Sequence, residues 1–387
     1  MCLYACAPQS NRRSGTVAVF TLVSAVVLIG FAALAVDVGH LYNVKAELQN
    51  AADAAALAGA SAFTEDRLRT SAYSSFDLIG AARQRALRYA AENPANSGPV
   101  RLAPEDVLLG QFDWEHPDQA LVQGGVFNSV QVTARCDEGS LNGPVINVFA
   151  GVLGFNTSDV SATAIAAFND RISGYSPDGT PAILPFTILV DFFEDQVVNG
   201  NDDFEYDEQL DVVKDFSDGI PEINLYPYKY FDSGADGSGN FGALNIGVDN
   251  QGTSDFRDQL VNGVSPEQFE AEIGSRELTF AAADGQPTPC YISGNTGVST
   301  GMEDAVATHA GKVVGFFLHT AVADPGSSAV FTIVSMRFGV LMEVDLTGNP
   351  ESKRIVIQPV VYEDSAVKID PDAPSTGGLV GRVMIVR

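Results

Sequence analysis

Residues 16–36 read TVAVFTLVSAVVLIGFAALAV, a run of 21 residues without a charged side chain. As a helix that rises 1.5 Å per residue, this run is about 31 Å long, which matches the hydrocarbon thickness of a bilayer. The apolar region of a cleavable signal peptide is usually shorter, about 7–15 residues, and ends at a small-residue cleavage site. The sequence therefore predicts a transmembrane helix at 16–36 that contacts the lipid bilayer, after a short N-terminal segment at 1–15.

Charged residues at the two ends of this run predict its orientation. Arg12 and Arg13 precede it, and Asp37 follows it directly. Because cytoplasmic flanks carry the excess of Lys and Arg, residues 1–15 are expected in the cytoplasm. The rest of the chain is then expected on the other side, as a periplasmic or cell-surface ectodomain.

The membrane helix is predicted to continue into a helical stem over 37–93, because no proline interrupts its first part and alanine is the strongest helix former. At 100° per residue, apolar and small side chains share one face of this stem. That face comprises Asp37, Leu41, Val44, Leu48, Ala51, Ala55 and Gly59.

Small residues spaced four apart, as at Ala51, Ala55 and Gly59, let two helix backbones approach closely. The face therefore predicts either an assembly contact with another subunit or packing on the chain's own ectodomain. Asp37 lies on it at the membrane boundary, where a carboxylate meets water or pairs with a cation of a neighbour.

Composition limits the partners of the exported part. The chain has 387 residues, with 49 Asp and Glu against 22 Lys and Arg, and a net charge of -27. So acidic a chain is not expected to bind nucleic acid or an anionic membrane surface, since both repel negative charge. Good solubility or cation binding fits this balance better.

The pattern beyond the membrane helix predicts an α+β fold in two parts. A helix at 77–93 leads to a small α+β module at 100–170, with strands at 107–114, 127–134 and 159–168 and a short helix at 145–153. A turn-rich break at 175–181 precedes an acidic β-rich ectodomain of sandwich-like type at 181–387. Its firmest strands are expected at 183–193, 312–321, 329–345 and 354–362.

One glycine-rich loop places oxygen atoms in a pattern that suits Ca²⁺, with Asp232, Asp236 and Asn240 as the candidate ligands. It lacks the spacing and the distal Glu of a calcium loop, so an ordinary solvated turn is the alternative. No other cofactor is expected. The chain has no HExxH pair, Gly-x-Ser-x-Gly elbow or Walker A loop, so no catalytic residue is predicted.

Two cysteines, Cys136 and Cys290, follow the membrane helix and would reach an oxidising compartment. They can form one disulfide bond or remain free thiols.

Three stretches of the N-terminal region resemble TadG-like proteins of Tad (Flp) pilus assembly. They are RRSG at 12–15, AVDVGHLY at 35–42 and LQNAADAAALAGA at 48–60. The close similarity covers about residues 11–63, and PVINVFAGVLGF at 144–155 with VSATAIAAF at 160–168 extends a looser one. Gly15 fits the cleavage site of type IV pilin-like proteins, but Phe20 occupies the position of their Glu, so the resemblance does not predict cleavage by a prepilin peptidase.

This resemblance implies a non-enzymatic, bacterial inner-membrane component of a Tad pilus or secretion apparatus, a minor pilin-like or accessory subunit whose partners are other Tad subunits. A membrane-tethered hydrolase or glycan-binding surface protein is the alternative, because residues 181–387 carry no assignable signature.

Overall fold

The computed structural model describes residues 14–64, 75–122, 127–177, 181–207, 210–226, 240–247, 253–280, 290–324, 328–349, 351–363, 366–370, 373 and 380–387. The chain forms two compact units, each built from separate stretches of sequence. Unit 1 comprises Met1–Ala55, Ala86–Val107 and Val132–Ala164, and unit 2 comprises Ala56–Arg85, Leu108–Gln131 and Ile165–Arg387.

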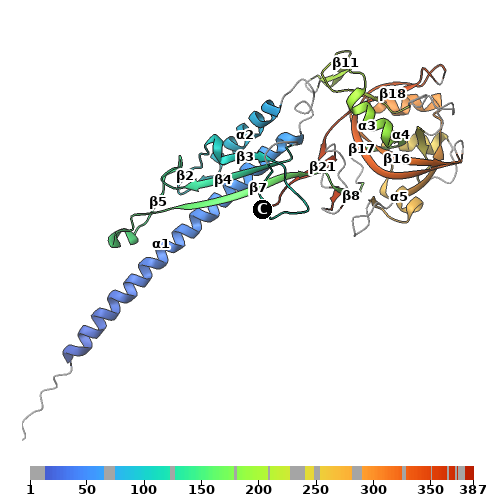
Figure 1. The fold of residues 1–387 in the computed structure, drawn as a ribbon. Helices are drawn as coiled ribbons and strands as arrows, with labels where there is room; N and C mark the ends of the chain where they lie inside the picture. The colour runs from blue at the N-terminus through green and yellow to red at the C-terminus, as the bar shows by residue number, and fades with distance from the viewer. Residues whose placement is uncertain are drawn as a thin grey trace, which may run out of the picture. The chain divides into compact units, whose positions relative to one another are not determined.

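Helix α1 (Ser14–Ala60) is a single uninterrupted helix, as Figure 1 shows in blue. Its apolar side chains from Val17 to Val36 are exposed, whereas the alanine-rich second half is largely buried along one face. Among the described residues, α1 is the helix that is long and apolar enough to cross a membrane. The predicted continuation of the apolar helix into a stem is therefore confirmed.

The other described elements before residue 170 are helix α2, short 3₁₀ turns and strands. They are η1 (Ser61–Thr64), α2 (Ser75–Glu92), β1 (Pro94–Ala95), β2 (Gly98–Pro99), η3 (Pro104–Asp106), β3 (Val107–Gly110), β4 (Ser129–Cys136), β5 (Val145–Ile146), η4 (Ala150–Leu153), β6 (Thr157–Ser158) and β7 (Val160–Asn169). The helix predicted at 145–153 is wrong. Residues 145–146 pair with β6, and only four residues form a 3₁₀ turn.

Strands β3, β4 and β7 belong to a five-stranded sheet of order β19-β21-β7-β4-β3, in which β19 is Tyr362–Glu363 and β21 is Val380–Ile385. The chain's C-terminal strand thus joins a sheet begun more than 200 residues earlier, because Ile385 pairs with Ala166.

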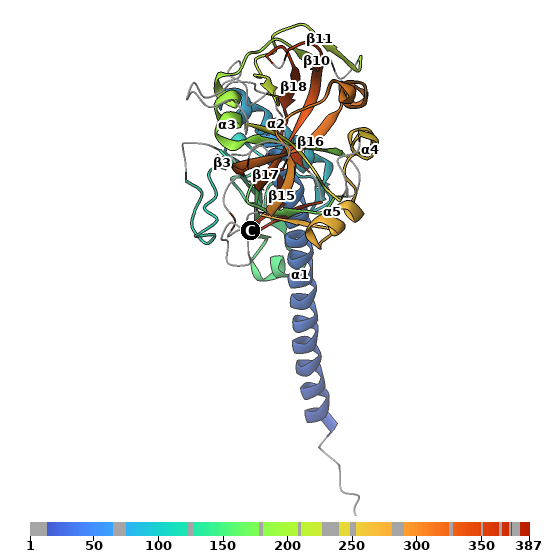
Figure 2. The ribbon, with the colours of Figure 1, turned by 90° about the vertical axis from the view of Figure 1, so that its right-hand side faces the viewer.

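Unit 2 is built on a seven-stranded, mostly antiparallel sheet of order β12-β18-β17-β15-β13-β9-β16. Its strands are β9 (Ala182–Leu189), β12 (Ile223–Asn224), β13 (Phe241–Leu244), β15 (Cys290–Asn295), β16 (Val313–Ala323), β17 (Ala329–Asp345) and β18 (Arg354–Pro359). Because β16 pairs with both β9 and β17, five of these strands close into a ring. Figure 2 labels β15, β16 and β17 of this ring. Strands β18 and β12 extend the sheet beyond this ring, so β12 remains an edge strand.

Each face of this sheet has its own apolar core. Phe186 and Phe316 face a core shared with the helices α3 (Val190–Asn199), α4 (Thr253–Asn262) and α6 (Glu303–Val306). Phe317 and Phe331 face a second core, shared with α5 (Pro266–Ile273) and a small sheet of β8 (Ile172–Tyr175), β14 (Leu278–Thr279) and β20 (Val367–Ile369). The predicted α+β class is confirmed, with helices covering one face where a sandwich would have a second sheet. The shorter remaining elements are β10 (Glu205–Asp207), β11 (Val212–Lys214), η5 (Thr300–Met302) and η6 (Ala307–His309).

Two predicted strand boundaries are informative. The strand expected at 183–193 ends at Leu189, and residues from Val190 onward form α3, because a continuous apolar run does not distinguish a strand from a buried helix. The strand expected at 329–345 is present in full as β17. Gly242 of β13 is required where it stands, since a Cβ atom there would lie 2.2 Å from the ring of Phe331.

Candidate functional site

Asp37 is the first charged residue after the exposed apolar part of α1, and its side chain is buried. Its Oδ1 accepts hydrogen bonds from the backbone N–H groups of Val148 and Phe149, at 2.9 and 3.1 Å. Its Oδ2 accepts from Phe149 and Ala150, at 3.0 and 2.5 Å. We call this arrangement the Asp37 clamp. It joins residues 111 to 113 positions apart, and all of them lie in unit 1.

The Asp37 clamp also sets the charge of this carboxyl. Burial alone would raise the pKa of Asp37, but the hydrogen bonds from Ala150, Phe149 and Val148 outweigh that effect and lower the pKa. Asp37 is therefore ionised at neutral pH, and its charge is stabilised by backbone N–H groups, with a smaller contribution from His40. These backbone donors were not expected from the sequence, which indicated water or a cation of a neighbour.

The segment that Asp37 holds has a compact local structure of its own. Strands β5 and β6 pair Val145 with Ser158, and the side chain of Asn147 donates to the carbonyl oxygen of Phe155 at 2.9 Å. Gly154 ends the 3₁₀ turn η4 with a φ of 92°, a left-handed conformation that glycine adopts without strain. Turn-forming Asn and Gly residues explain why this stretch is a closed loop and not a helix.

Beyond Asp37, α1 packs into unit 1 along one face. Val44, Leu48, Ala51 and Ala55 are fully buried there. Polar contacts from the flanks of that face fix the helix. Lys45 donates to the carbonyl oxygen of Ser161, Gln49 donates to that of Thr163, and Glu47 accepts from the backbone N–H of Asn96.

A comparison with protein families matches the same helix. Residues 15–62 match the Tad family, described as "Putative Flp pilus-assembly TadE/G-like". The chain carries a Tad domain. A comparison with curated proteins and with solved structures gave no match. The Tad domain coincides with α1 and η1, so it holds both the exposed apolar stretch and the buried stem, with Asp37 between them.

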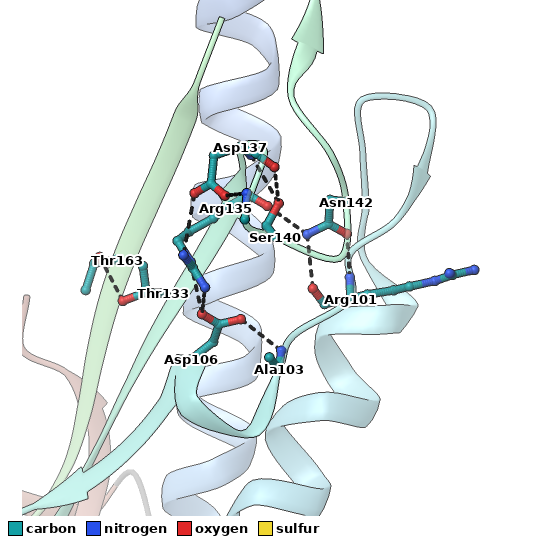
Figure 3. Close-up of polar contacts among 10 residues, drawn as sticks. Arg101, Ala103, Asp106, Thr133, Arg135, Asp137, Ser140, Asn142 and Thr163 are labelled. Carbon is teal, nitrogen blue, oxygen red and sulfur yellow. Dashed lines mark hydrogen bonds and ion pairs between the residues drawn. The ribbon is translucent and has the colours of Figure 1, made fainter.

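An ion-pair network lies beside the Tad domain in unit 1 (Figure 3). Arg135 of β4 donates from Nε and Nη2 to one oxygen of Asp106, at 3.0 and 2.6 Å. The other oxygen of Asp106 accepts from the backbone N–H of Ala103 and caps η3. The hydrogen bond with Asp106 raises the pKa of Arg135 further above its ordinary value. No sequence motif pointed to this pair, although the Pro at the start of η3 signals a turn there.

The predicted assembly face is largely covered by the chain itself. Leu41 is half-buried, and the other six residues of the face, from Asp37 to Gly59, are buried. For this side of the Tad domain, the structure therefore supports packing on the chain's own ectodomain. The sequence had left this alternative open. Contacts with another subunit are available to the exposed side of α1.

Most of the predicted calcium loop lies outside the described residues. Asp232 and Asp236 lie outside the described residues, and Asn240 is buried, with its carbonyl oxygen accepting from the backbone N–H of Leu189. Within the described ranges, no group of three or more His, Cys, Asp or Glu side chains could hold a metal ion. Nδ1 of His319 lies 2.9 Å from the hydroxyl of Thr187, and both side chains are buried.

Cys136 and Cys290 are free thiols in the structure. Burial raises the pKa of both thiols, and the carboxylates of Asp137 and Glu47 add to the effect at Cys136. Because the thiolate is the reactive form, we expect both cysteines to react slowly with iodoacetamide at neutral pH in the native protein and rapidly after denaturation. Mass mapping without reductant checks this, and a disulfide-linked peptide pair would contradict it.

Glu222 in unit 2 is a buried carboxyl whose pKa is raised to about 7 by burial, against hydrogen bonds from Asp203 and Phe204. The folded state then holds this proton more tightly than the unfolded state, so stability falls as pH rises from 4.5 to about 7. The full effect corresponds to roughly 3 kcal/mol. We expect Glu222→Gln to remove this part of the pH dependence of denaturant unfolding. Identical pH profiles for the two proteins would contradict the prediction.

Proposed function

We propose that this chain is a non-enzymatic, membrane-anchored component of a Tad (Flp) pilus assembly or secretion apparatus, as a minor pilin-like or accessory subunit. The observation that carries the proposal is the Tad domain at residues 15–62. This domain is mostly the helix α1. The first part of α1 is apolar and exposed, and its second part is packed within unit 1. Such a helix suits a protein that transmits contacts in the membrane to an exported domain.

The exposed part of α1 supports an anchor role. From Val17 to Val36 its side chains contact little of the described chain, and a helix with apolar residues on all sides is stable in lipid rather than in water. Arg12 and Arg13 favour an orientation with the N-terminus in the cytoplasm. The other Tad subunits would then meet this helix within the bilayer and the acidic ectodomain outside it.

This orientation makes a direct prediction. A C-terminal fusion to alkaline phosphatase, which folds only outside the cytoplasm, is expected to be active, and an N-terminal fusion is expected to be inactive. Enzyme assays on whole cells measure both. An inactive C-terminal fusion, together with fluorescence from a cytoplasmic reporter at the same end, would contradict this orientation. The ectodomain would then not be exported.

Copurification tests the proposed function. The full chain, tagged at its C-terminus and extracted in mild detergent after crosslinking in cells, is expected to bring down other Tad pilus subunits. A matched tagged protein with an unrelated membrane helix is the control. Recovery of the chain without Tad subunits, together with turnover of peptide or glycan by the purified protein, would favour the tethered hydrolase instead. The location of the chain then separates the two roles. A fibre subunit would be present in sheared pili, and an accessory subunit would be present only in membranes.

A further inference from the structure

The loop between β5 and β6 exposes a set of large apolar side chains in unit 1. We call this set the apolar loop surface. It consists of Ile146, Val148, Phe149, Val152 and Phe155, which are 71%, 63%, 43%, 87% and 69% exposed. No charged residue occurs from Leu141 to Ser158. Folded proteins rarely expose several large apolar side chains together, so this set is typical of an interaction site.

The position of the apolar loop surface is fixed by the Asp37 clamp. Two of its members, Val148 and Phe149, donate their backbone N–H groups directly to Asp37. Asp37 is the residue at which the uncharged apolar stretch of α1 ends. The surface therefore continues the exposed apolar part of α1, which includes Leu34 and Val36 on the turn before Asp37.

Many backbone N–H groups of the loop have hydrogen-bond partners within the chain, which suits an environment poor in water. Where water is scarce, each unpaired N–H group costs several kcal/mol, so irregular segments are normally excluded. Here the N–H groups of residues 148–150 are bonded to Asp37. Those of Asn147, Val152, Gly154 and Phe155 are bonded to carbonyl oxygens within the loop.

We propose that the apolar loop surface rests in the outer-facing leaflet of the lipid bilayer, at the boundary between headgroups and acyl chains, as a second membrane contact beside α1. Segments held in this way bury their apolar face by about 5–10 Å. The contact is uncharged, which suits a strongly acidic chain that anionic lipids would repel. The inference rests on the proposed anchor role of α1. The loop contact would hold the ectodomain at a fixed height above the membrane.

Fluorescence of single-tryptophan variants tests the contact in the full chain. Trp114 is the single tryptophan of the sequence, so Trp114→Phe gives a dark background. In this background, Val152→Trp places the reporter at a side chain that is 87% exposed and therefore tolerant of replacement. The protein is reconstituted in phosphatidylcholine vesicles whose acyl chains carry bromine either near the headgroup or near the chain end.

We expect the emission of Val152→Trp to shift to shorter wavelength and to be quenched most by bromine near the headgroup. Tyr89→Trp is the matched control. This variant keeps an exposed aromatic residue on α2. The loop after α2 contacts Glu47, which lies about 15 Å along α1 from Asp37. The emission of this variant is expected to stay water-like and unquenched.

A third variant, Val27→Trp, separates this inference from the anchor itself. If Val27→Trp is quenched and Val152→Trp is not, the loop contact is refuted while the anchor stands. A blue shift of Val152→Trp without quenching would place the loop against protein and would also refute a lipid contact. If Val27→Trp escapes quenching, the proposed anchor fails, and the loop contact fails with it.

Discussion

Replacing Asp37 with asparagine is expected to release residues 148–150 from α1. The substitution keeps the size of the side chain but removes its charge and turns one acceptor oxygen into an NH₂ donor. That donor would face the N–H group of Val148 or of Ala150, besides that of Phe149, so at least one backbone donor loses its partner. Hydrogen exchange at the amides of residues 148–150 should rise to the rate of an unprotected loop.

Hydrogen exchange with mass spectrometry on the full chain in detergent measures this effect. Asp53→Asn is the matched control on the same helix, because Asp53 accepts from the side chain of Gln49 four residues away and not from the backbone of a distant segment. We expect the control to leave the loop protected. Full protection of residues 148–150 in Asp37→Asn would contradict the clamp.

Replacing Ala55 with leucine is expected to destabilise the protein itself. Ala55 is fully buried on the face of α1 that packs within the chain, and added methylene groups in such a site cost about 1–3 kcal/mol. Leu48→Ala removes packing from the same face and should cost about 2–5 kcal/mol. Both changes should lower the free energy of unfolding in detergent and the amount of protein in cells.

Ala46→Leu is the control for this face, since Ala46 is exposed on the same helix and leucine is also a good helix former. It should accumulate normally. If Ala55→Leu instead accumulates normally and only abolishes piliation, the face contacts another subunit, as the small-residue spacing suggested, and the intramolecular account is wrong.

Much of the N-terminal architecture could be predicted because its signals are strong and local. The 21 uncharged residues at 16–36 and the alanine-rich stem both favour one continuous helix, which is α1. The long strand β17 was predicted in full for a similar reason, since eight of its 17 residues from Ala329 to Asp345 are β-branched or aromatic.

The Asp37 clamp could not be predicted, because its partners are backbone N–H groups, which every residue except proline carries. A carboxylate at a membrane boundary indicates water or a cation from sequence alone. Only the fold brings Val148 to Asp37 across 111 positions. The strand predicted at 183–193 was wrong at its C-terminal end for another reason. Strand β9 and helix α3 are both apolar there, so periodicity could not locate their junction at Leu189.

Deletion of the gene in a cell that produces Flp pili tests the central claim most directly. If the chain is a component of the Tad apparatus, deletion should remove pilin from the sheared surface fraction, and the full chain supplied in trans should restore it. The chain carrying an unrelated membrane helix in place of residues 16–36, with the buried part of α1 intact, should be exported but should not restore pili. Normal amounts of sheared pilin in the deletion cells would contradict the account.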